Sequence, residues 1–502
     1  MSVKANVISN YIGQITIAVL NFIFIPTYIK YIGVEAYGLV GMFAVLQMAL
    51  NTLDGSIIPL ISREMSCYLG GTKPLDSLRN LLRTAEIICL TIGIIFIVIV
   101  SLLADFLSTN WFIVEKLPSE LIAHAIRIAI FVVALRALED LYKGVLTGLQ
   151  KQVTQNSIAI ICAIFRFVGV IYALKYFDST IKTFYYWQLL SSIITTFTYV
   201  VVCYKSIPGM LTQSRFKFEE IKNNLSFTIG SFSFALSSFI NTQADKIIIS
   251  KLLPLTEVAY YTLASSITNV LLMVSHPVTL AFYPKIITLR SQEQHEAAAL
   301  NYHLKCQIIN LTCGVAAFSL IFYGNYIIGY WTQDSDLTAN VMPYVRLLAI
   351  SMYILINANT NLLLPYIAGK PIISGKISGF SIILVICITI PLAYYFKSYG
   401  AAFGNIIQNT FIFLAFPLCF NCYLKSEQTT WFIKDFLIPT LTIAMLFYIS
   451  TLCSFVTSTD LTGVITCVLI AIIILVISSF TCDKLREKIN LLISPSTRNN
   501  IS

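Results

Sequence analysis

Long apolar stretches alternate with short polar segments along almost the whole chain. A bilayer core of about 30 Å requires roughly 20 apolar residues in a helix, and uncharged runs reach that length repeatedly. Such runs lie at 5–29, 183–204, 258–284, 306–333, 436–459 and 461–482. The pattern therefore predicts an all-α polytopic membrane protein.

Hydropathy predicts fourteen membrane-spanning helices, counted from the start of the chain. They lie near 7–29, 38–59, 85–104, 121–147, 156–175, 183–204, 225–250, 258–283, 306–330, 341–366, 377–396, 401–423, 436–455 and 461–480. The segments between them are too short to form a soluble domain of typical size. Any function must therefore be built from the helices themselves.

A faint internal repeat divides the chain. ISNYIG at 8–13 opens the first span and LSFTIG at 225–230 opens the seventh, and each is followed by a turn with a glutamate and a tyrosine. Six helices separate the copies, so both run in the same direction, and parallel repeats indicate two bundles with a site between them. We expect an N-terminal six-helix bundle at 1–204, a cytoplasmic linker at 205–224, a C-terminal six-helix bundle at 225–423, and two additional helices with a tail at 424–502.

Charge is scarce and unevenly placed. Hydrophobic residues make up 57% and charged residues 11% of the chain, and the formal net charge is +9. Of the 33 basic residues, 21 fall in segments on one side of the predicted membrane, for example Lys151, Lys205 and Lys305, and six on the other. The positive-inside rule then places both termini in the cytoplasm. Because the basic residues lie in short loops and not on one face, the charge predicts topology and not nucleic-acid binding.

The remaining six basic residues lie within spans, where an ionisable side chain is by default a functional-site hypothesis. In the span 121–147, Arg136 and Asp140 are four residues apart, as are Glu139 and Lys143, so both pairs can form along one stripe. Arg166 has no acidic residue within a helical turn. It requires a partner on another helix, a water-filled cavity or an anionic ligand, and these alternatives stay open.

Other polar residues in the spans complete the list of candidates. The cationic candidates for substrate binding are Arg136, Arg166, Arg127, Arg346 and Lys246. The candidates for a polar lining are Asn10, Gln14, Asn21, Asn357 and Asn361. The candidates for ion coupling are Asp54, Glu139, Asp140 and Asp245. Hydrogen bonding between helices explains the amides of the first span as well as a cavity lining does.

No pattern of catalytic or metal-binding residues emerges. Cys419 and Cys422 form a lone CxxC pair within a predicted span, and the four histidines are scattered. HExxH, GxSxG and phosphate-loop patterns are absent from the sequence. We therefore expect a transporter without a metal or organic cofactor, and not an enzyme.

Short segments in both halves carry a family resemblance. YIGVEAYGL at 31–39, followed by Leu53-Asp54-Gly55 and Arg63-Glu64, resembles the opening of bacterial polysaccharide transporters of the O-antigen flippase type. DKIIIS at 245–250, before Tyr260-Tyr261, resembles the start of their second half. The resemblance covers the full length and the helix count, and it is specific to a superfamily, the multidrug/oligosaccharidyl-lipid/polysaccharide exporters, more than to one substrate.

The resemblance implies a fold and a function. It implies two pseudo-symmetric bundles in a V around a central cavity, and translocation of an undecaprenyl-pyrophosphate-linked glycan, as in lipopolysaccharide O-antigen assembly, to the outer leaflet of the bacterial inner membrane. Alternating access, coupled to a proton or sodium gradient, would drive this step. Membrane lipids and other polysaccharide assembly proteins are the further partners, without nucleic acid. The alternatives are a drug/cation antiporter of the same fold, which would be expected to use intramembrane carboxylates, and a membrane glycan polymerase or ligase, which should show a large outer loop.

Overall fold

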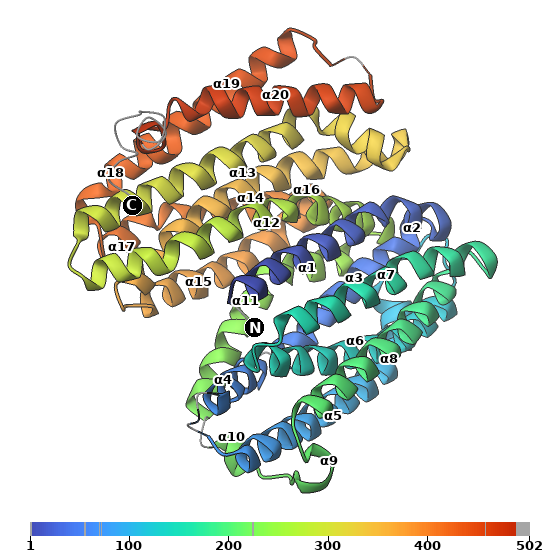
Figure 1. Cartoon of the computed structure of the whole chain (residues 1–502). Coiled ribbons are helices and arrows are strands. Elements are labelled where there is room, and N and C mark those ends of the chain that lie inside the picture. Colours follow the sequence, from blue (N-terminus) through green and yellow to red (C-terminus); the bar gives the residue numbers. More distant parts are fainter. Residues whose placement is uncertain are drawn as a thin grey trace. The chain divides into compact units, whose positions relative to one another are not determined.

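Helices make up nearly all of the computed structural model, which describes residues 3–54, 57–69, 71, 73–222, 225–456 and 458–487 (Figure 1). In this part of the chain, β-type pairing is limited to one isolated bridge between Ile113 and Pro254. The chain divides into two compact units, Met1–Ala259 and Tyr260–Ser502. The predicted all-α fold class is confirmed.

The first unit contains the helices up to α11. They are α1 (Val3–Ile23), α2 (Ile25–Ile32), α3 (Val34–Asp54), α4 (Ile57–Leu69), α5 (Leu75–Phe106), η1 (Leu107–Trp111), α6 (Ser119–Gly148), α7 (Gln152–Tyr176), α8 (Ile181–Ser206), α9 (Met210–Gln213), α10 (Glu219–Lys222) and α11 (Leu225–Leu252). η1 is a π-helical turn that continues α5. Prolines precede several helix starts, such as Pro74 before α5 and Pro118 before α6, because proline has no amide hydrogen to leave unpaired there.

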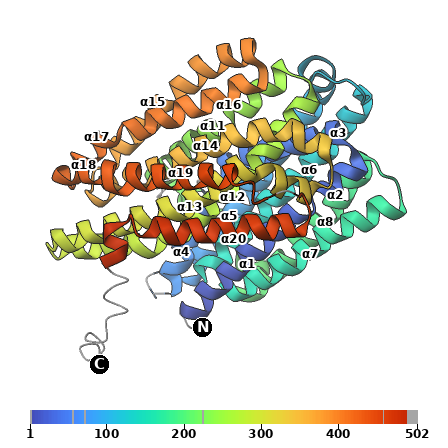
Figure 2. The ribbon, with the colours of Figure 1, turned by 90° about the horizontal axis from the view of Figure 1, so that it is seen from above.

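The second unit contains the rest of the helices. They are α12 (Leu255–Ser291), which begins in the first unit, α13 (His295–Thr332), α14 (Ser335–Ile367), α15 (Ile372–Leu384), η2 (Val385–Thr389), α16 (Ile390–Leu414), α17 (Phe416–Phe420), η3 (Lys425–Glu427), α18 (Gln428–Thr430), η4 (Trp431–Leu437), α19 (Ile438–Leu452) and α20 (Leu461–Ser479). Figure 2 shows α13, α19 and α20 lying close to one another. The Asp334 side chain accepts hydrogen bonds from the first amides of α14 and so fixes its start.

Twelve helical segments among the described residues are long and apolar enough to cross a membrane. One of them, Ile372–Phe420, is interrupted at Lys397, where φ is 54° and ψ is −137°. Gly400 follows the break, and a Cβ atom there would collide with the carbonyl oxygen of Leu392. This segment therefore supplies two helices. With α11, whose 28 residues extend about 42 Å, every one of the fourteen predicted spans has a helical counterpart.

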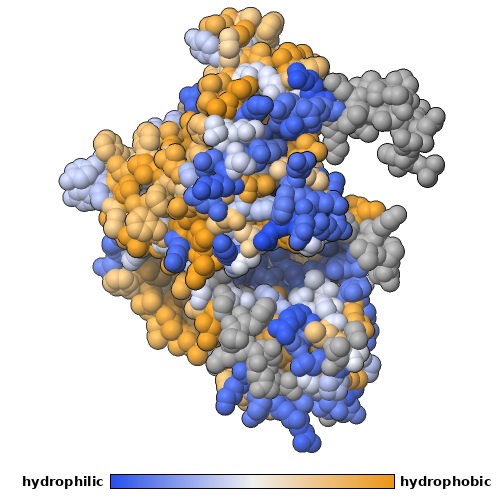
Figure 3. All heavy atoms as spheres, turned by 90° about the vertical axis from the view of Figure 1, so that its left-hand side faces the viewer, coloured by the Kyte–Doolittle hydropathy of each residue, from blue (hydrophilic) through white to orange (hydrophobic). Residues whose placement is uncertain are grey.

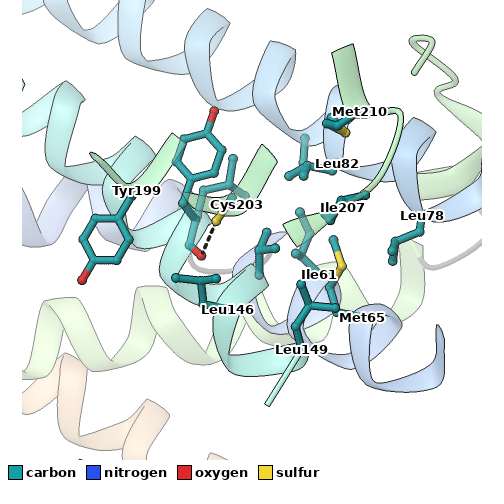
Figure 4. Close-up of a cluster of buried hydrophobic side chains, with 14 of the residues drawn as sticks. Ile61, Met65, Leu78, Leu82, Leu146, Leu149, Tyr199, Cys203, Ile207 and Met210 are labelled. Atoms are coloured by element: carbon teal, nitrogen blue, oxygen red, sulfur yellow. Dashed lines mark hydrogen bonds between the residues drawn. The ribbon is translucent and has the colours of Figure 1, made fainter. Parts of the chain in front are cut away.

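α6 is the central helix of the first unit, where α3, α4, α5 and α8 pack against it. Figure 4 shows part of this core, to which α4 contributes Ile61, α5 contributes Leu82 and α6 contributes Leu146. The Cys203 thiol of α8 donates to the carbonyl oxygen of Tyr142, 3.4 Å away. In a lipid environment, tight packing and such hydrogen bonds hold helices together, because lipid tails are as apolar as the side chains.

The compact units divide one helix later than the repeat in the sequence suggests. α11 opens the predicted second bundle, but it packs against α3 and α4 of the first unit. The Trp111 indole also donates to the Ser250 hydroxyl near the end of α11, over 3.0 Å. These contacts explain why the first unit extends to Ala259, while the bundle boundaries drawn from the repeat stay a prediction.

Large apolar side chains remain exposed along several helices. On α5 they include Ile94 and Leu102, and on α20 they include Leu469 and Ile473. Figure 3 shows that hydrophobic residues occupy large areas of one face of the molecule. Rows of exposed apolar side chains on helices of this length are expected where a protein faces lipid.

Candidate functional site

Four ionisable residues of α6 form a charged stripe in the first unit. Arg136, Glu139, Asp140 and Lys143 lie on neighbouring turns of one helix. The Lys143 ammonium lies 2.8 Å from Glu139 Oε1 and 3.0 Å from Asp140 Oδ1, so the predicted pair of Glu139 and Lys143 is present. Glu139 is only 5% exposed, and a buried carboxylate requires such partners.

Arg166 of α7 contacts the other oxygen of the same carboxylate. Its Nη2 lies 3.4 Å from Glu139 Oε2. Of the alternatives open for Arg166 from the sequence, the structure therefore provides a partner on another helix. The pairing leaves its Nε buried and without a hydrogen-bond partner in the described part of the chain. Its Nε–H is thus a buried donor without a partner in the described structure.

Arg136 does not take Asp140 as its hydrogen-bond partner, although their spacing allows it. Its Nη2 donates instead to Gln188 Oε1 of α8, over 2.7 Å. Its guanidinium carbon lies 5.1 Å from the centre of the Phe43 ring of α3, a cation–π contact. Its Nε is also buried without a hydrogen-bond partner among the residues described. Arg136 therefore joins α3, α6 and α8, and its Nε–H is left without a partner in the described structure.

We call Arg136, Glu139, Asp140, Lys143 and Arg166 the cationic cluster. It holds three cations and two carboxylates, so its formal charge is +1. Asn51 of α3 completes the surroundings of Asp140 with an amide 3.4 Å away. The cluster thus combines a positive charge with two unused guanidinium donors, which is suited to an anion.

An apolar cavity of about 210 Å³ adjoins the cationic cluster within the first unit. Phe43, beneath the Arg136 guanidinium, is one of its lining residues, and Tyr185, Trp111, Ala129 and Phe239 are others. An apolar cavity of about 150 Å³ already stays dry and binds a benzene molecule. The first unit therefore places a cationic site beside a space for an apolar group.

The other predicted cations have different surroundings. Arg127 Nη2 is 2.6 Å from Asp105 Oδ2, and both side chains are substantially exposed. The Lys246 ammonium lies 3.3 Å from Gln243 Oε1, one turn earlier on α11. Arg346 of α14 is exposed. Within the first unit, the structure thus brings together Arg136 and Arg166, while Arg127 and Lys246 contact other residues.

The predicted polar-lining residues have different surroundings. Asn10 of α1 accepts a hydrogen bond from Asn156 of α7 over 2.6 Å, whereas Gln14 and Asn21 are exposed. Asn357 donates to the carbonyl oxygen of its own helix four residues earlier. Asn361 accepts from the Tyr302 hydroxyl over 2.9 Å. Hydrogen bonding between helices therefore accounts for Asn10 and Asn361.

The predicted ion-coupling residues are also separated. Glu139 and Asp140 belong to the cationic cluster, where cations contact both. Asp245 is buried in α11. The side chain of Asp54 lies outside the described residues. A role for any of the four in ion coupling stays a prediction.

A second polar cluster, in the second unit, was not predicted from the sequence. Its members are His303, Gln307, Glu427, Asp435 and Asp483, and we call it the acidic cluster. Its signal in the sequence is the spacing of His303, Gln307 and Asn310, which share one face of a helix. Lys305, expected in a loop, is fully buried in α13, because this helix begins ten residues earlier.

Comparison with known proteins places the chain in a family. A model of the polysaccharide biosynthesis protein family matches residues 3–290. No curated protein sequence matches the chain. Among solved structures, the chain is similar to one described as lipid II flippase MurJ in an inward closed conformation. The TM-score is 0.73 at 16% identity, over 94% of this chain and 97% of that one.

Multidrug transporters show the same fold. An inward-facing MATE family transporter of the MOP superfamily has a TM-score of 0.63 at 14% identity, over 84% of this chain and 99% of that one. A mutant of the Vibrio cholerae MATE transporter VcmN has a TM-score of 0.57 at 12% identity, over 85% of this chain and 97% of that one. The protein belongs to the polysaccharide biosynthesis protein family. It is a multi-pass membrane protein with the fold of MOP-superfamily transporters, which confirms the resemblance seen at 31–39 and 245–250.

Proposed function

We propose that this protein is a flippase that moves an undecaprenyl-pyrophosphate-linked oligosaccharide, such as an O-antigen repeat unit, from the inner to the outer leaflet of the bacterial inner membrane. Family membership supports a role in polysaccharide biosynthesis, and the similarity to a structure named lipid II flippase supports a lipid-linked substrate. In this proposal both termini are cytoplasmic, alternating access carries the substrate, and a proton or sodium gradient drives it.

The observation that carries the proposal is the unused donor capacity of the cationic cluster. Burying Arg136 and Arg166 near Lys143 is costly unless each charge is compensated. Glu139 and Asp140 compensate two of the three, and two guanidinium Nε atoms remain unpaired in the described structure. A diphosphate brings about two negative charges and several acceptor oxygens, which arginine contacts in a bidentate manner.

The apolar cavity supports an amphiphilic substrate and not a free anion. Phe43 contacts the Arg136 guanidinium and also lines the cavity. A prenyl diphosphate has its charge at one end of an apolar chain. With the diphosphate at Arg136, the first isoprenoid units of that chain would reach the cavity.

The drug/cation antiporter reading has less support from the same residues. A site for a cationic drug requires a carboxylate that no other cation neutralises. Lys143 and Arg166 hold Glu139, and Lys143 and Asn51 contact Asp140. The cluster as a whole therefore repels a cation.

The proposal is tested in proteoliposomes that contain a fluorescent prenyl-diphosphate-linked oligosaccharide and an impermeant quencher outside. We expect Arg136→Ala and Arg166→Ala each to slow the appearance of quenchable lipid at least tenfold, because one lost charge-assisted contact costs about 1.5–3 kcal/mol. Arg136→Lys should recover only part of the rate, since lysine lacks the planar fork.

Lys175→Ala is the matched control, because it removes a cation from the exposed end of the helix that carries Arg166. It should flip lipid at the parent rate. Parent rates in both Arg136→Ala and Arg166→Ala, with normal insertion, would refute the role of the cationic cluster. A parent protein that flips prenyl-linked lipids without the diphosphate equally well would refute the proposed substrate class.

A further inference from the structure

The acidic cluster of the second unit surrounds one buried histidine with carboxylates. His303 of α13 is 4% exposed. Its Nδ1 lies 2.5 Å from Asp435 Oδ2 of η4, and its Nε2 lies 3.4 Å from Glu427 Oε2 of η3. Asp435 is 2% exposed. One imidazole thus lies between two carboxylates of the segment that leads into α19.

Gln307 connects the acidic cluster to the segment after α20. Its amide nitrogen donates to Asp435 Oδ1 over 2.8 Å and to Asp483 Oδ1 over 2.7 Å. Its amide oxygen accepts from the Leu485 amide over 3.1 Å. Both hydrogen-bonding atoms of the Gln307 amide are therefore in use, and the residue joins α13 to η4 and to the segment after α20.

The two ring nitrogens of His303 have different surroundings. Nδ1 is within hydrogen-bonding distance of Asp435, whereas Nε2 is buried and makes no hydrogen bond in the described structure. With Nδ1 protonated, a neutral imidazole would present the Nε2 lone pair to the Glu427 carboxylate. A proton on Nε2 would turn this repulsive contact into an ion pair.

The charges around His303 favour such a proton. The cluster holds three carboxylates, Glu427, Asp435 and Asp483, and the Lys434 ammonium contacts one of them, 3.4 Å from Asp483 Oδ2. Burial raises the pKa of Asp483, but hydrogen bonds from Gln307 and the Lys484 amide, with Lys434 nearby, outweigh it and hold the pKa below its ordinary value. Asp483 is therefore ionised at neutral pH and adds to the negative charge.

Tyr302 and Lys305 are titratable neighbours of His303 in the sequence of α13, and Lys305 lies on the opposite side of the helix. The Tyr302 ring packs edge-on against the His303 ring. The Lys305 ammonium lies 4.6 Å from the Tyr302 ring centre and 3.5 Å from the Thr360 carbonyl oxygen. No group of three or more His, Cys, Asp or Glu side chains in the described chain is arranged to hold a metal ion. The geometry therefore fits a proton better than a metal.

We propose that His303, between Asp435 and Glu427, is a proton-binding site that controls how firmly η3 and η4 attach to α13. Hydronium transfers one proton to Nε2 and leaves as water, while Nδ1 keeps its proton and its contact with Asp435. The protonated imidazolium then pairs with both carboxylates. η3 and η4 are held most firmly to α13 at pH values where His303 carries this extra proton. Their attachment weakens as the pH rises and the proton is lost. If the protein is the flippase proposed above, this site is the one through which a proton gradient acts.

Trp431 provides a local reporter for the test. It lies in η4, is 1% exposed, and packs against Phe413 and Phe420. The chain has four tryptophans, so Trp111→Phe, Trp187→Phe and Trp331→Phe together leave Trp431 alone. As the pH rises, we expect the Trp431 emission to shift to the red in a single transition between about pH 5 and 8, where histidine titrates.

His303→Gln should abolish this transition, and His124→Gln, in the other unit, should leave it unchanged. Should His303→Gln not fold, Glu427→Gln keeps the histidine and removes the carboxylate facing Nε2. It should lower the midpoint by about one pH unit, because a nearby negative charge favours the protonated form. An unchanged transition in His303→Gln, or an unshifted midpoint in Glu427→Gln, overturns the proposal, as does a parent without a transition.

The fluorescence test needs no substrate, so its result is independent of the proposed flippase function. The coupling role is tested separately by flipping in proteoliposomes with an imposed pH gradient. A rate that responds to the gradient in the parent but not in His303→Gln supports coupling at this site. A response that is absent from the parent, or equal in both proteins, overturns the coupling role. Proton binding at His303 is then judged by the fluorescence result alone.

Discussion

The two clusters lack opposite kinds of partner. The cationic cluster of the first unit has more donors and positive charge than its own carboxylates satisfy. The acidic cluster of the second unit has three carboxylates and one histidine, whose Nε2 makes no hydrogen bond in the described structure. In our two proposals, an anion completes the first cluster and a proton completes the second.

This difference has a physical cause. The centre of each cluster, Glu139 in one and His303 with Asp435 in the other, is buried, and an uncompensated charge is costly there. In the first unit the extra cations come from two helices, α6 and α7, and meet at the shared carboxylate of Glu139. In the second unit the carboxylates come from the segments around η4 and after α20, and they meet at α13. The proposed roles differ accordingly: the first cluster would bind an anionic ligand, and the second connects η4 and the segment after α20 to α13.

Asp435→Ala is expected to have the largest effect, because it removes the central acceptor of the acidic cluster. His303 and Gln307 would both lose a buried partner, and breaking a buried charged pair costs about 3–5 kcal/mol. Thermal unfolding in detergent should show a much lower midpoint. Asp483→Ala, which removes a partly exposed carboxylate, should cost clearly less. Equal losses would show that Asp435 is not central to the cluster.

Glu139→Gln is expected to have an intermediate effect and to sharpen the comparison. The variant keeps the side-chain shape but raises the formal charge of the cationic cluster from +1 to +2. Lys143 and Arg166 would lose their shared carboxylate, and we expect the unliganded protein to lose about 1–3 kcal/mol. An anionic ligand should stabilise Glu139→Gln by more than it stabilises the parent.

The measurement compares unfolding midpoints with and without a prenyl diphosphate. The increase on ligand binding should be larger in Glu139→Gln than in the parent, and Asp435→Ala should not enlarge it. A smaller increase in Glu139→Gln would mean that Glu139 itself takes part in binding. The cationic cluster would then resemble the acidic cluster, because in both a carboxylate would take part in binding.

Much of the fold could be predicted from sequence because lipid imposes a simple length rule. Fourteen apolar stretches predicted fourteen helical segments, including the break between 396 and 401, where Lys397 leaves the helical path. Helix starts were less predictable. α13 continues to His295 through polar residues, because buried partners such as Asp435 and Thr360 stabilise His303 and Lys305 there.

The candidate site was predictable in part. The pairing of Glu139 with Lys143 follows from their spacing on one helix. The partners of Arg136 and Arg166 do not, because Gln188 and Glu139 lie on other helices and only packing brings them near. The acidic cluster was missed for the same reason, since its carboxylates are more than 120 residues away from His303.

Arg127→Ala is expected to have the smallest effect, and it tests the boundary of the cationic cluster. Arg127 pairs with Asp105 over 2.6 Å, with side-chain exposures of 41% and 71%. Exposed pairs contribute at most about 1 kcal/mol and weaken as salt rises. Unfolding and flipping should therefore both stay close to the parent, with any stability loss disappearing in high salt. A tenfold loss of flipping at unchanged stability would place Arg127 in the substrate path after all. The positive region that meets the substrate would then extend beyond the buried cluster, and exposure would no longer separate cations that bind substrate from those that only pair.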